Sequence, residues 1–264
     1  MKPLPFLIWT ACLLGSGCTS NSPTVRLPTQ LPQGAQLPST RLVVDSLRLV
    51  DAARNRVVPI ATYSPTANPS GARLRLKVAL LNHGYGGYNT DYTFVAQTLA
   101  DHGYFVASIQ HELRGDEPLA MTGKLIETRK PNWERGVQNM QFVLTELRHR
   151  HPELDYRHLL LMGHSNGGDM VMLFAEKYPQ SVDRIISFDN RRMPLPRAEH
   201  PQVLSLRSSD QLPDSSVLPS PAEQAKFRMQ IVQLARTLHN DMWDGATPEQ
   251  KQEMTTWISR FLEK

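Results

Sequence analysis

Ser165 is the residue of this sequence best placed for nucleophilic chemistry. It stands in the middle of the run Gly-His-Ser-Asn-Gly at residues 163–167. The four apolar residues 159–162 predict a strand buried on both faces, and apolar residues at helical spacing follow from Met170. A serine in a tight turn between a strand and a helix is exposed, and the free N–H groups of the helix start point at any oxyanion beside it. The pattern predicts a catalytic serine nucleophile; the alternative is a glycine-rich turn that only packs.

With this strand, turn and helix the chain resembles the α/β-hydrolase superfamily, over about residues 41–264. The resemblance implies an α/β fold with a mostly parallel eight-stranded sheet. It further implies an antiparallel N-terminal hairpin and helices on both faces of the sheet. The short, proline-rich segment 193–201 leaves no room for a large cap domain between the strands on either side of it.

The resemblance also implies the partners of the serine. In the superfamily the histidine lies in the loop between the last strand and the last helix, and His239 matches that position. The acid usually follows the strand before it, which implies Asp210. Asp189, at the end of the preceding strand, and Asp214 are the alternatives. We expect a triad of Ser165, Asp210 and His239.

Two backbone donors for an oxyanion follow from the same resemblance. The segment His83-Gly84-Tyr85 comes after the third predicted strand, and the superfamily uses the amide of the residue after this glycine, here Tyr85. The second donor would be Asn166, directly after the nucleophile. Each such donor contributes about 3–4 kcal/mol to transition-state stabilisation. The His83 side chain is expected to be structural.

A serine, an imidazole and a carboxylate together carry out acyl transfer. His239 would remove the proton of the hydroxyl and return it to the leaving group, and the acid would orient the imidazole. No metal or organic cofactor is implied. We expect hydrolysis of a small carboxylic ester, with an aminopeptidase or amidase, or a non-catalytic binding module on the same fold, as alternatives. Arg191 and Arg192 could receive an acidic substrate group, although solvated charges are the more ordinary interpretation.

The remaining pattern supplies the elements that position these residues. Alternation predicts a hairpin over 42–50 and 57–63. Thr247, Pro248 and Gln250 predict the start of the last helix, with a capping box. A polar loop over 110–131 is expected to shape the pocket. The other predicted strands are 76–81, 104–109, 182–188, 202–207 and 227–234, and the other predicted helices are 92–101 and 132–151.

Composition narrows the functional classes. The chain has 264 residues, 40% of them hydrophobic, which suits one α/β domain, predicted at 41–264. The formal charge of +4 comes from scattered basic residues, so nucleic-acid binding is not expected. Both cysteines, Cys12 and Cys18, lie near the start, which excludes a cysteine nucleophile or a disulfide from the domain. The oligomeric state is left open.

The first residues have the pattern of an export signal. Lys2 is followed by an apolar run from Leu4 to Leu14 and by the small residues Gly-Ser-Gly before Cys18. Residues 1–18 are therefore interpreted as a signal peptide, and the exit resembles a bacterial lipoprotein site at which Cys18 would be lipidated; a plainly cleaved signal is the alternative. Residues 19–40, rich in Ser, Thr, Pro and Gln, are expected to be a flexible tether. We expect an exported protein, anchored as a periplasmic-side or outer-membrane lipoprotein, or alternatively soluble and secreted or periplasmic.

Overall fold

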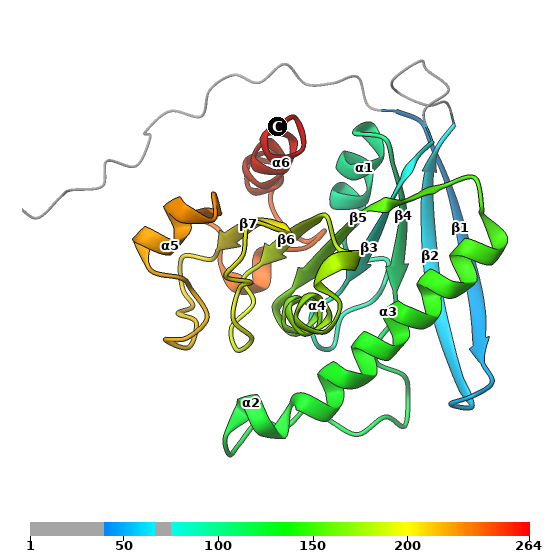
Figure 1. The fold of residues 1–264 in the computed structure, drawn as a ribbon, viewed down its shortest axis with the longest axis horizontal. Helices are drawn as coiled ribbons and strands as arrows, with labels where there is room; N and C mark the ends of the chain where they lie inside the picture. The colour runs from blue at the N-terminus through cyan, green and yellow to red at the C-terminus, as the bar shows by residue number, and fades with distance from the viewer. Residues whose placement is uncertain (1–39, 67–74) are drawn as a thin grey trace, which may run out of the picture. The chain divides into compact units, whose positions relative to one another are not determined.

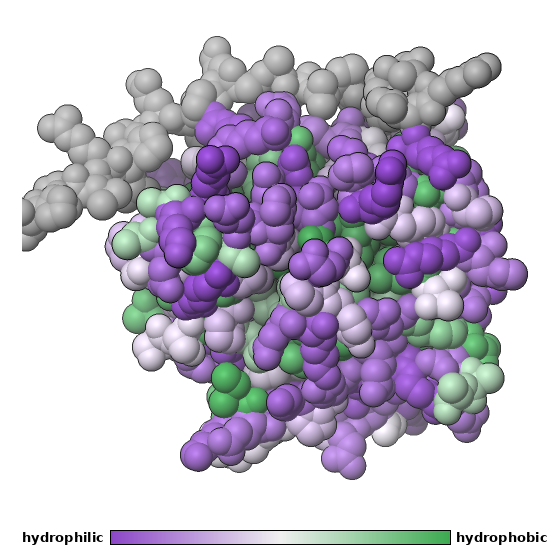
Figure 2. Space-filling model, in the orientation of Figure 1, coloured by the Kyte–Doolittle hydropathy of each residue, from purple (hydrophilic) through white to green (hydrophobic). Residues whose placement is uncertain are grey.

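The computed structural model of the chain describes residues 40–66 and 75–264. The predicted signal peptide and the tether up to residue 39 lie outside the described residues. Within the described part, none of the helices combines the length and the hydropathy needed to cross a membrane. On the face drawn in Figure 2, hydrophilic side chains predominate and hydrophobic ones are scattered among them.

An eight-stranded sheet organises the described chain (Figure 1). Its spatial order is β1-β2-β4-β3-β5-β6-β7-β8. The pairs β1–β2 and β2–β4 are antiparallel and all the others are parallel, so the predicted fold class is confirmed. The strands are β1 Leu42–Asp51, β2 Arg56–Pro65, β3 Lys77–Asn82, β4 Tyr104–Ile109, β5 Asp155–His164, β6 Arg184–Phe188, β7 Gln202–Arg207 and β8 Gln230–Gln233.

Helices cover the two faces of the sheet. In Figure 1, α3 and α4 lie in front of the strands, and α1 and α6 pack against each other on the opposite side. No helix interrupts the connection from β6 to β7, in keeping with the absence of a large cap there. The helices are α1 Thr93–Asp101, α2 Leu125–Thr128, α3 Lys130–Arg150, α4 Ser165–Lys177, α5 Pro221–Lys226 and α6 Pro248–Leu262, with single turns of 3₁₀ helix at η1 Pro179–Ser181 and η2 His239–Asp241.

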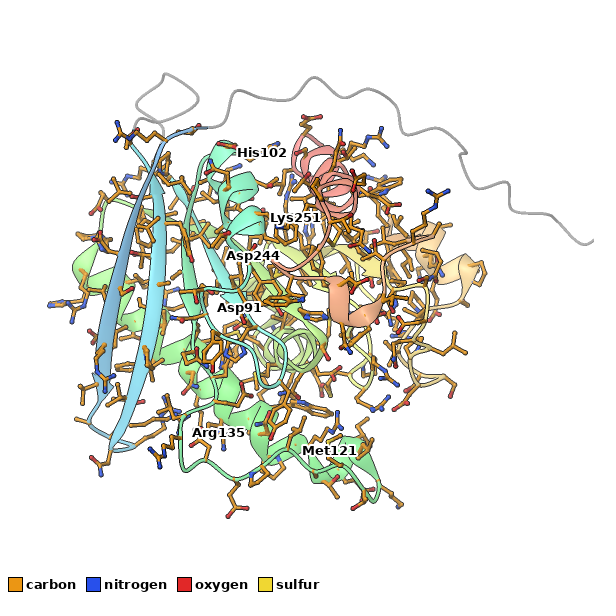
Figure 3. All side chains as sticks on the ribbon, turned by 180° about the vertical axis from the view of Figure 1, so that it is seen from behind. Asp91, His102, Met121, Arg135, Asp244 and Lys251 are labelled. Carbon is orange, nitrogen blue, oxygen red and sulfur yellow. The ribbon has the colours of Figure 1, made fainter. Side chains whose placement is uncertain are left out.

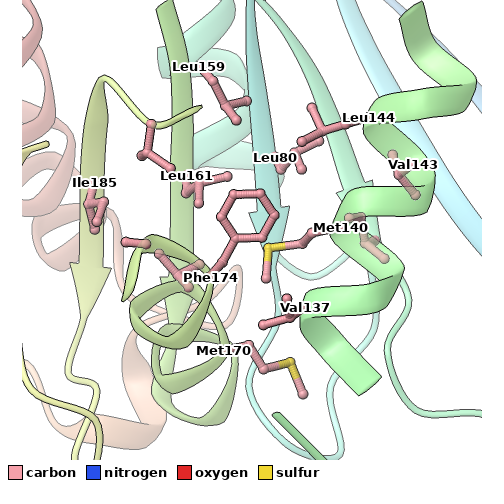
Figure 4. Packing of buried hydrophobic residues seen from close by; sticks show 14 of the residues in the cluster. Leu80, Val137, Met140, Val143, Leu144, Leu159, Leu161, Met170, Phe174 and Ile185 are labelled. Atoms are coloured by element: carbon pink, nitrogen blue, oxygen red, sulfur yellow. The ribbon is translucent and has the colours of Figure 1, made fainter. Parts of the chain in front are cut away.

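The alternation of side chains along the central strands creates two hydrophobic cores. In β5, Leu159 and Leu161 face α3 and α4, whereas Leu160 and Met162 face α1 and α6. Figure 4 shows the first core, in which Phe174 of α4 lies against the strand side chains. Because helices cover both faces of the sheet, the sequence of β5 contains a continuous run of apolar residues and does not alternate between apolar and polar ones.

The second half of the chain differs from expectation in one connection. The predicted strand 227–234 is reduced to β8, because the short helix α5 and a turn with Arg228 at φ 54° precede it. The sequence does carry the signal for α5: Ser220 accepts a hydrogen bond from the Glu223 amide, and the Glu223 carboxylate accepts one from the Ser220 amide. Thr247 and Gln250 form the same kind of capping box at the start of α6, as predicted.

The loop after η2 is tied to the start of α1, where no side chain of the helix itself provides a cap. The carboxylate of Asp244 accepts hydrogen bonds from the amides of Thr93 and Phe94 and from the Thr93 hydroxyl. The amide of Asp244 donates to the carbonyl of Asp91, and Figure 3 shows these two aspartates near each other. This long-range cap satisfies the first amides of α1 and fixes the loop that follows His239.

Candidate active site

Ser165 occupies a tight turn between β5 and α4. Its φ of 51° lies in the left-handed region, which a serine adopts only when its surroundings hold it there. A Cβ atom added to Gly163 would lie 2.4 Å from the carbonyl oxygen of Gly167. One added to Gly167 would lie 2.4 Å from the carbonyl oxygens of Asn82 and His83. Both glycines are therefore sterically required, and the loop after β3 is pressed against the serine turn.

His239 joins Ser165 to a buried carboxylate. The Nε2 atom of His239 lies 2.9 Å from the Ser165 hydroxyl oxygen, and Nδ1 lies 2.6 Å from Oδ2 of Asp189. An ionised carboxylate only accepts hydrogen bonds, so Nδ1 carries the proton and Nε2 accepts from the serine hydroxyl. The chain thus brings a hydroxyl, an imidazole and a carboxylate into one hydrogen-bonded line.

The carboxylate in this line is Asp189, and the prediction of Asp210 as the partner of the ring is wrong. Asp210 is exposed and accepts a hydrogen bond of 2.7 Å from the main-chain amide of His239 instead. The third candidate, Asp214, pairs with Arg192.

The register of the sheet explains this choice. His164 pairs with Phe188, and Phe188 pairs with Leu206, in three neighbouring parallel strands. The residues that follow these partners, Ser165 and Asp189 among them, therefore leave the sheet side by side. Asp210 lies four residues beyond Leu206, so it is too far along its loop to lie beside Ser165 and Asp189 at the strand ends.

Asp189 is fully buried, and the end of β7 supplies its counter-groups. Arg207 lies 2.8 Å from Oδ1, the hydroxyl of Ser208 donates to Oδ2 at 2.7 Å, and the Ser208 amide donates to Oδ1 at 3.3 Å. Burial by itself raises the pKa of the Asp189 carboxyl. The hydrogen bond from His239, the charge of Arg207 and the hydrogen bond from Ser208 together outweigh burial and hold the pKa below its ordinary value. Asp189 is therefore ionised at neutral pH.

His164 holds the main chain of His239 from the other side. Its Nε2–H donates to the His239 carbonyl at 3.1 Å, and its Nδ1 accepts from the hydroxyl of Tyr92 at 2.7 Å. The Tyr92 oxygen in turn accepts from the amide of Gly84 at 3.1 Å. Burial, with a smaller effect of the nearby His239, lowers the pKa of His164 to about 3, so this ring is neutral. Sequence reasoning assigned no role to His164 or Tyr92, because their link depends on residues 72 positions apart.

The two predicted oxyanion donors lie on the two segments that meet at the serine turn. As the second residue of α4, Asn166 has an amide without an acceptor inside the helix. Its side chain is buried and fixed, since it accepts from the indole N–H of Trp133 and donates to Asn132, both at 2.8 Å. Tyr85 is half exposed, and its hydroxyl accepts from the amide of Leu119 at 3.1 Å.

His83 is buried beside this loop and is bonded to main chain through both ring nitrogens. Its Nδ1–H donates to the carbonyl of Gly84 at 2.7 Å, and its Nε2 accepts from the amide of His111 at 3.0 Å. This arrangement is structural, as expected, and it orients the peptide that precedes Tyr85. Among residues 40–66 and 75–264, no group of three or more His, Cys, Asp or Glu side chains is arranged to hold a metal ion.

Comparison with known proteins bears on the fold and on part of the sequence. A family model described as serine aminopeptidase, S33, matches residues 75–189, which include Ser165 and Asp189. No curated protein sequence matches the chain.

Several solved structures share the fold at low sequence identity. A ferulic acid esterase from Streptomyces cinnamoneus is 19% identical, with a TM-score of 0.63, over 86% of this chain and 91% of that one. A promiscuous phosphotriesterase similar to dienelactone hydrolases, from metagenomic libraries, is 15% identical, with a TM-score of 0.60, over 83% and 98%. A hyperthermophilic esterase from the archaeon Pyrobaculum calidifontis is 13% identical, with a TM-score of 0.60, over 84% and 83%. At such identities the likeness concerns the fold.

Proposed function

We propose that this chain, an α/β-hydrolase by its fold and by the family model that matches residues 75–189, is a serine hydrolase that cleaves carboxylic esters through an acyl-enzyme. The observation that carries the proposal is the hydrogen-bonded line from Ser165 through His239 to the buried Asp189. The strained serine, the required glycines and the orientation of the imidazole, with Nδ1 toward Asp189 and Nε2 toward the serine, all suit this reaction.

The reaction begins at the serine hydroxyl. As its oxygen forms a bond to the ester carbon, the proton passes to Nε2 of His239, and the carbonyl oxygen becomes an oxyanion. The amides of Tyr85 and Asn166 would donate to this oxyanion. The imidazolium then gives its proton to the departing alkoxide, leaving an acyl-enzyme, and water repeats the steps to release the acid. Asp189 stays ionised throughout and stabilises the imidazolium.

A second candidate reaction is hydrolysis of an amide or of an N-terminal peptide bond by the same three residues. The description of the matching family model, serine aminopeptidase, favours it. The esterases among the structures with this fold favour the ester. A non-catalytic binding module would not need a serine, a histidine and an aspartate in hydrogen-bonding contact, so it is the least favoured.

The test replaces Ser165 with alanine and measures turnover of short-chain 4-nitrophenyl esters and of aminoacyl 4-nitroanilides. We expect kcat for the better substrate class to fall by a factor of about 10⁴ or more, since the nucleophile is lost. Ser181→Ala is the matched control, because Ser181 is exposed beyond the far end of α4. A fluorophosphonate probe should label the wild type and the control but not the Ser165 variant. Full activity of Ser165→Ala would refute the proposal.

We also propose that the protein is exported and lipidated at Cys18, on the pattern of residues 1–18 alone. Palmitate labelling of the wild type in a bacterial host, lost in Cys18→Ala, would support lipidation. Export without label would favour the plainly cleaved signal.

A further inference from the structure

Three arginines lie on the two segments that flank the first turn of α4. Arg129 is the N-cap residue of α3, and Arg191 and Arg192 follow Asp189 by two and three residues. All three are partly buried, and the Arg192 side chain is only 11% exposed and pairs with Asp214, so Arg192 is not a freely solvated charge. Burial first, and then the charges of Arg192 and Arg191, lower the pKa of Arg129, which places the three guanidinium groups within electrostatic range of one another.

Arg129 approaches the first turn of α4 from the side of α3. Asn132 and Trp133, three and four residues further on, lie on the same face of α3 and bond directly to the side chain of Asn166. Figure 3 labels Met121, whose sulfur lies 3.6 Å from the Arg129 guanidinium, in the segment beside α2. Arg129 also donates to the carbonyl of Ala120 at 2.8 Å. Asn166, the residue after Ser165, is therefore hydrogen-bonded to side chains that lie about one helical turn from Arg129.

The loop of Arg191 and Arg192 approaches the same turn from the side of β6. The Arg192 amide donates at 2.9 Å to Asp169, which lies one helical turn after Ser165. A Cβ atom on Gly168 would lie 2.8 Å from the Cβ of Asn190. Since Arg191 is two residues from Asp189, their Cα atoms are at most about 7 Å apart.

The positive charge of this cluster is not fully matched. Arg192 pairs with Asp214 at 2.8 Å, and half of the Asp214 side chain is exposed. Asp169 is fully buried, its carboxylate accepts from main-chain amides, and burial raises its pKa to about 6 despite those bonds. Within the described residues, the Arg191 side chain forms no hydrogen bond or ion pair, and its Nε is buried without an acceptor.

We propose that Arg191, supported by Arg129 and Arg192, forms a subsite for a carboxylate carried by the ester substrate. A guanidinium with an unused, partly buried edge binds a carboxylate through two parallel hydrogen bonds, a geometry that a water molecule does not supply. The substrate class is therefore an ester with a free carboxylate, on either its acyl or its alcohol part. This inference rests on the proposed hydrolase function for its chemistry, and its binding step is testable without turnover.

The kinetic experiment compares charged and neutral esters of matched size. 4-Nitrophenyl monoglutarate against 4-nitrophenyl pentanoate tests the acyl part, and 4-acetoxybenzoate against its methyl ester tests the alcohol part. In the wild type we expect kcat/KM to be at least about 10-fold higher for the charged member of one pair, mainly through KM. Arg191→Gln should remove that preference and leave the neutral esters within about 2-fold, while Arg191→Lys should keep part of it. Arg157→Gln is the control, since that side chain is 88% exposed.

The binding experiment uses Ser165→Ala and glutarate at constant ionic strength. We expect glutarate to raise the thermal midpoint of Ser165→Ala, and this rise to disappear when Arg191→Gln is added. Turnover of neutral esters with no charged-ester preference would overturn the subsite and leave the hydrolase proposal standing. A glutarate effect without Ser165-dependent turnover of any ester would uphold the subsite and overturn the hydrolase. No glutarate effect and no preference would overturn the subsite.

Discussion

Asp189 and Asp210 leave neighbouring strands and hold the same histidine by different groups. Asp189 is fully buried and accepts from the ring of His239, whereas Asp210 is exposed and accepts from its main-chain amide. The Asp189 carboxylate also has the guanidinium of Arg207 2.8 Å away. Water screens the charge of an exposed carboxylate, while a buried one acts at low dielectric on the imidazolium that forms beside it. Proximity to His239 is therefore not sufficient for a catalytic acid; burial with a counter-charge distinguishes the two.

β7 has an unexpected part in this difference. The strand expected to precede the acid instead supplies the partners of Asp189. These are Arg207 at the last position of the strand and Ser208 directly after it. Arg207 also donates to the carbonyl of Asn190 at 2.8 Å, which steadies the loop that Asp189 begins. The two strand ends work as one unit, with the Asp189 carboxylate directly after β6 and its electrostatic support at the end of β7.

Replacing Asp189 with asparagine should give the largest effect. The amide preserves the shape but cannot stabilise the imidazolium, and it can favour the wrong tautomer of His239, so we expect kcat for esters to fall by about 10⁴. Circular dichroism and the thermal midpoint would establish that the variant is folded, since Arg207 loses its counter-charge. A loss of less than 10-fold in a folded variant would mean that Asp189 is not the acid.

His164, which donates to the main-chain carbonyl of His239, should make the stability of the protein depend on pH. His164 has a pKa of about 3 when folded, against 6.5 when unfolded. Below pH 6.5 the His164 ring therefore binds a proton in the unfolded chain, whereas in the folded chain it binds one only near pH 3. The free energy of unfolding consequently falls as the pH falls from 6.5 toward 3. Through His164 alone, the free energy of unfolding should fall by about 3 kcal/mol as the pH falls from 6.5 to 4.

Urea unfolding at several pH values would measure this slope. His164→Asn should flatten it by about 1.4 kcal/mol per pH unit, and the exposed His149→Asn should not. Burial also lowers the pKa values of His83 and His111, so part of the slope should persist in the His164 variant. An unchanged slope would show that His164 is not buried and neutral.

Asp210→Asn should give the smallest effect. The side-chain oxygen of asparagine can still accept the His239 amide, and the site is exposed, so we expect kcat to change by less than about 5-fold and stability by less than about 1 kcal/mol. A loss comparable to that of Asp189→Asn would erase the distinction between the two aspartates. Measuring both variants on the same ester gives the comparison directly.

The sequence by itself determined the features that depend on local backbone chemistry. Glycines at 163 and 167 around a serine, between an apolar run and a helical pattern, sufficed to predict the turn from β5 into α4. Alternation predicted the first hairpin, and the capping box at Thr247 predicted the start of α6. Each of these signals lies within a few residues of what it specifies, because steric fit in a turn and hydrogen bonding at a helix end are short-range.

Only the tertiary structure decided which groups meet at the site. Asp189 and Asp210 both precede His239 and both follow strands, so order and spacing could not separate them; the register of β5, β6 and β7 did. The link from Tyr92 to His164, and the hydrogen bond from the Arg192 amide to Asp169 of α4, likewise join residues far apart in the chain. A carboxylate becomes the partner of an imidazole through the level at which its strand ends and the dielectric around it, and both are properties of the assembled sheet.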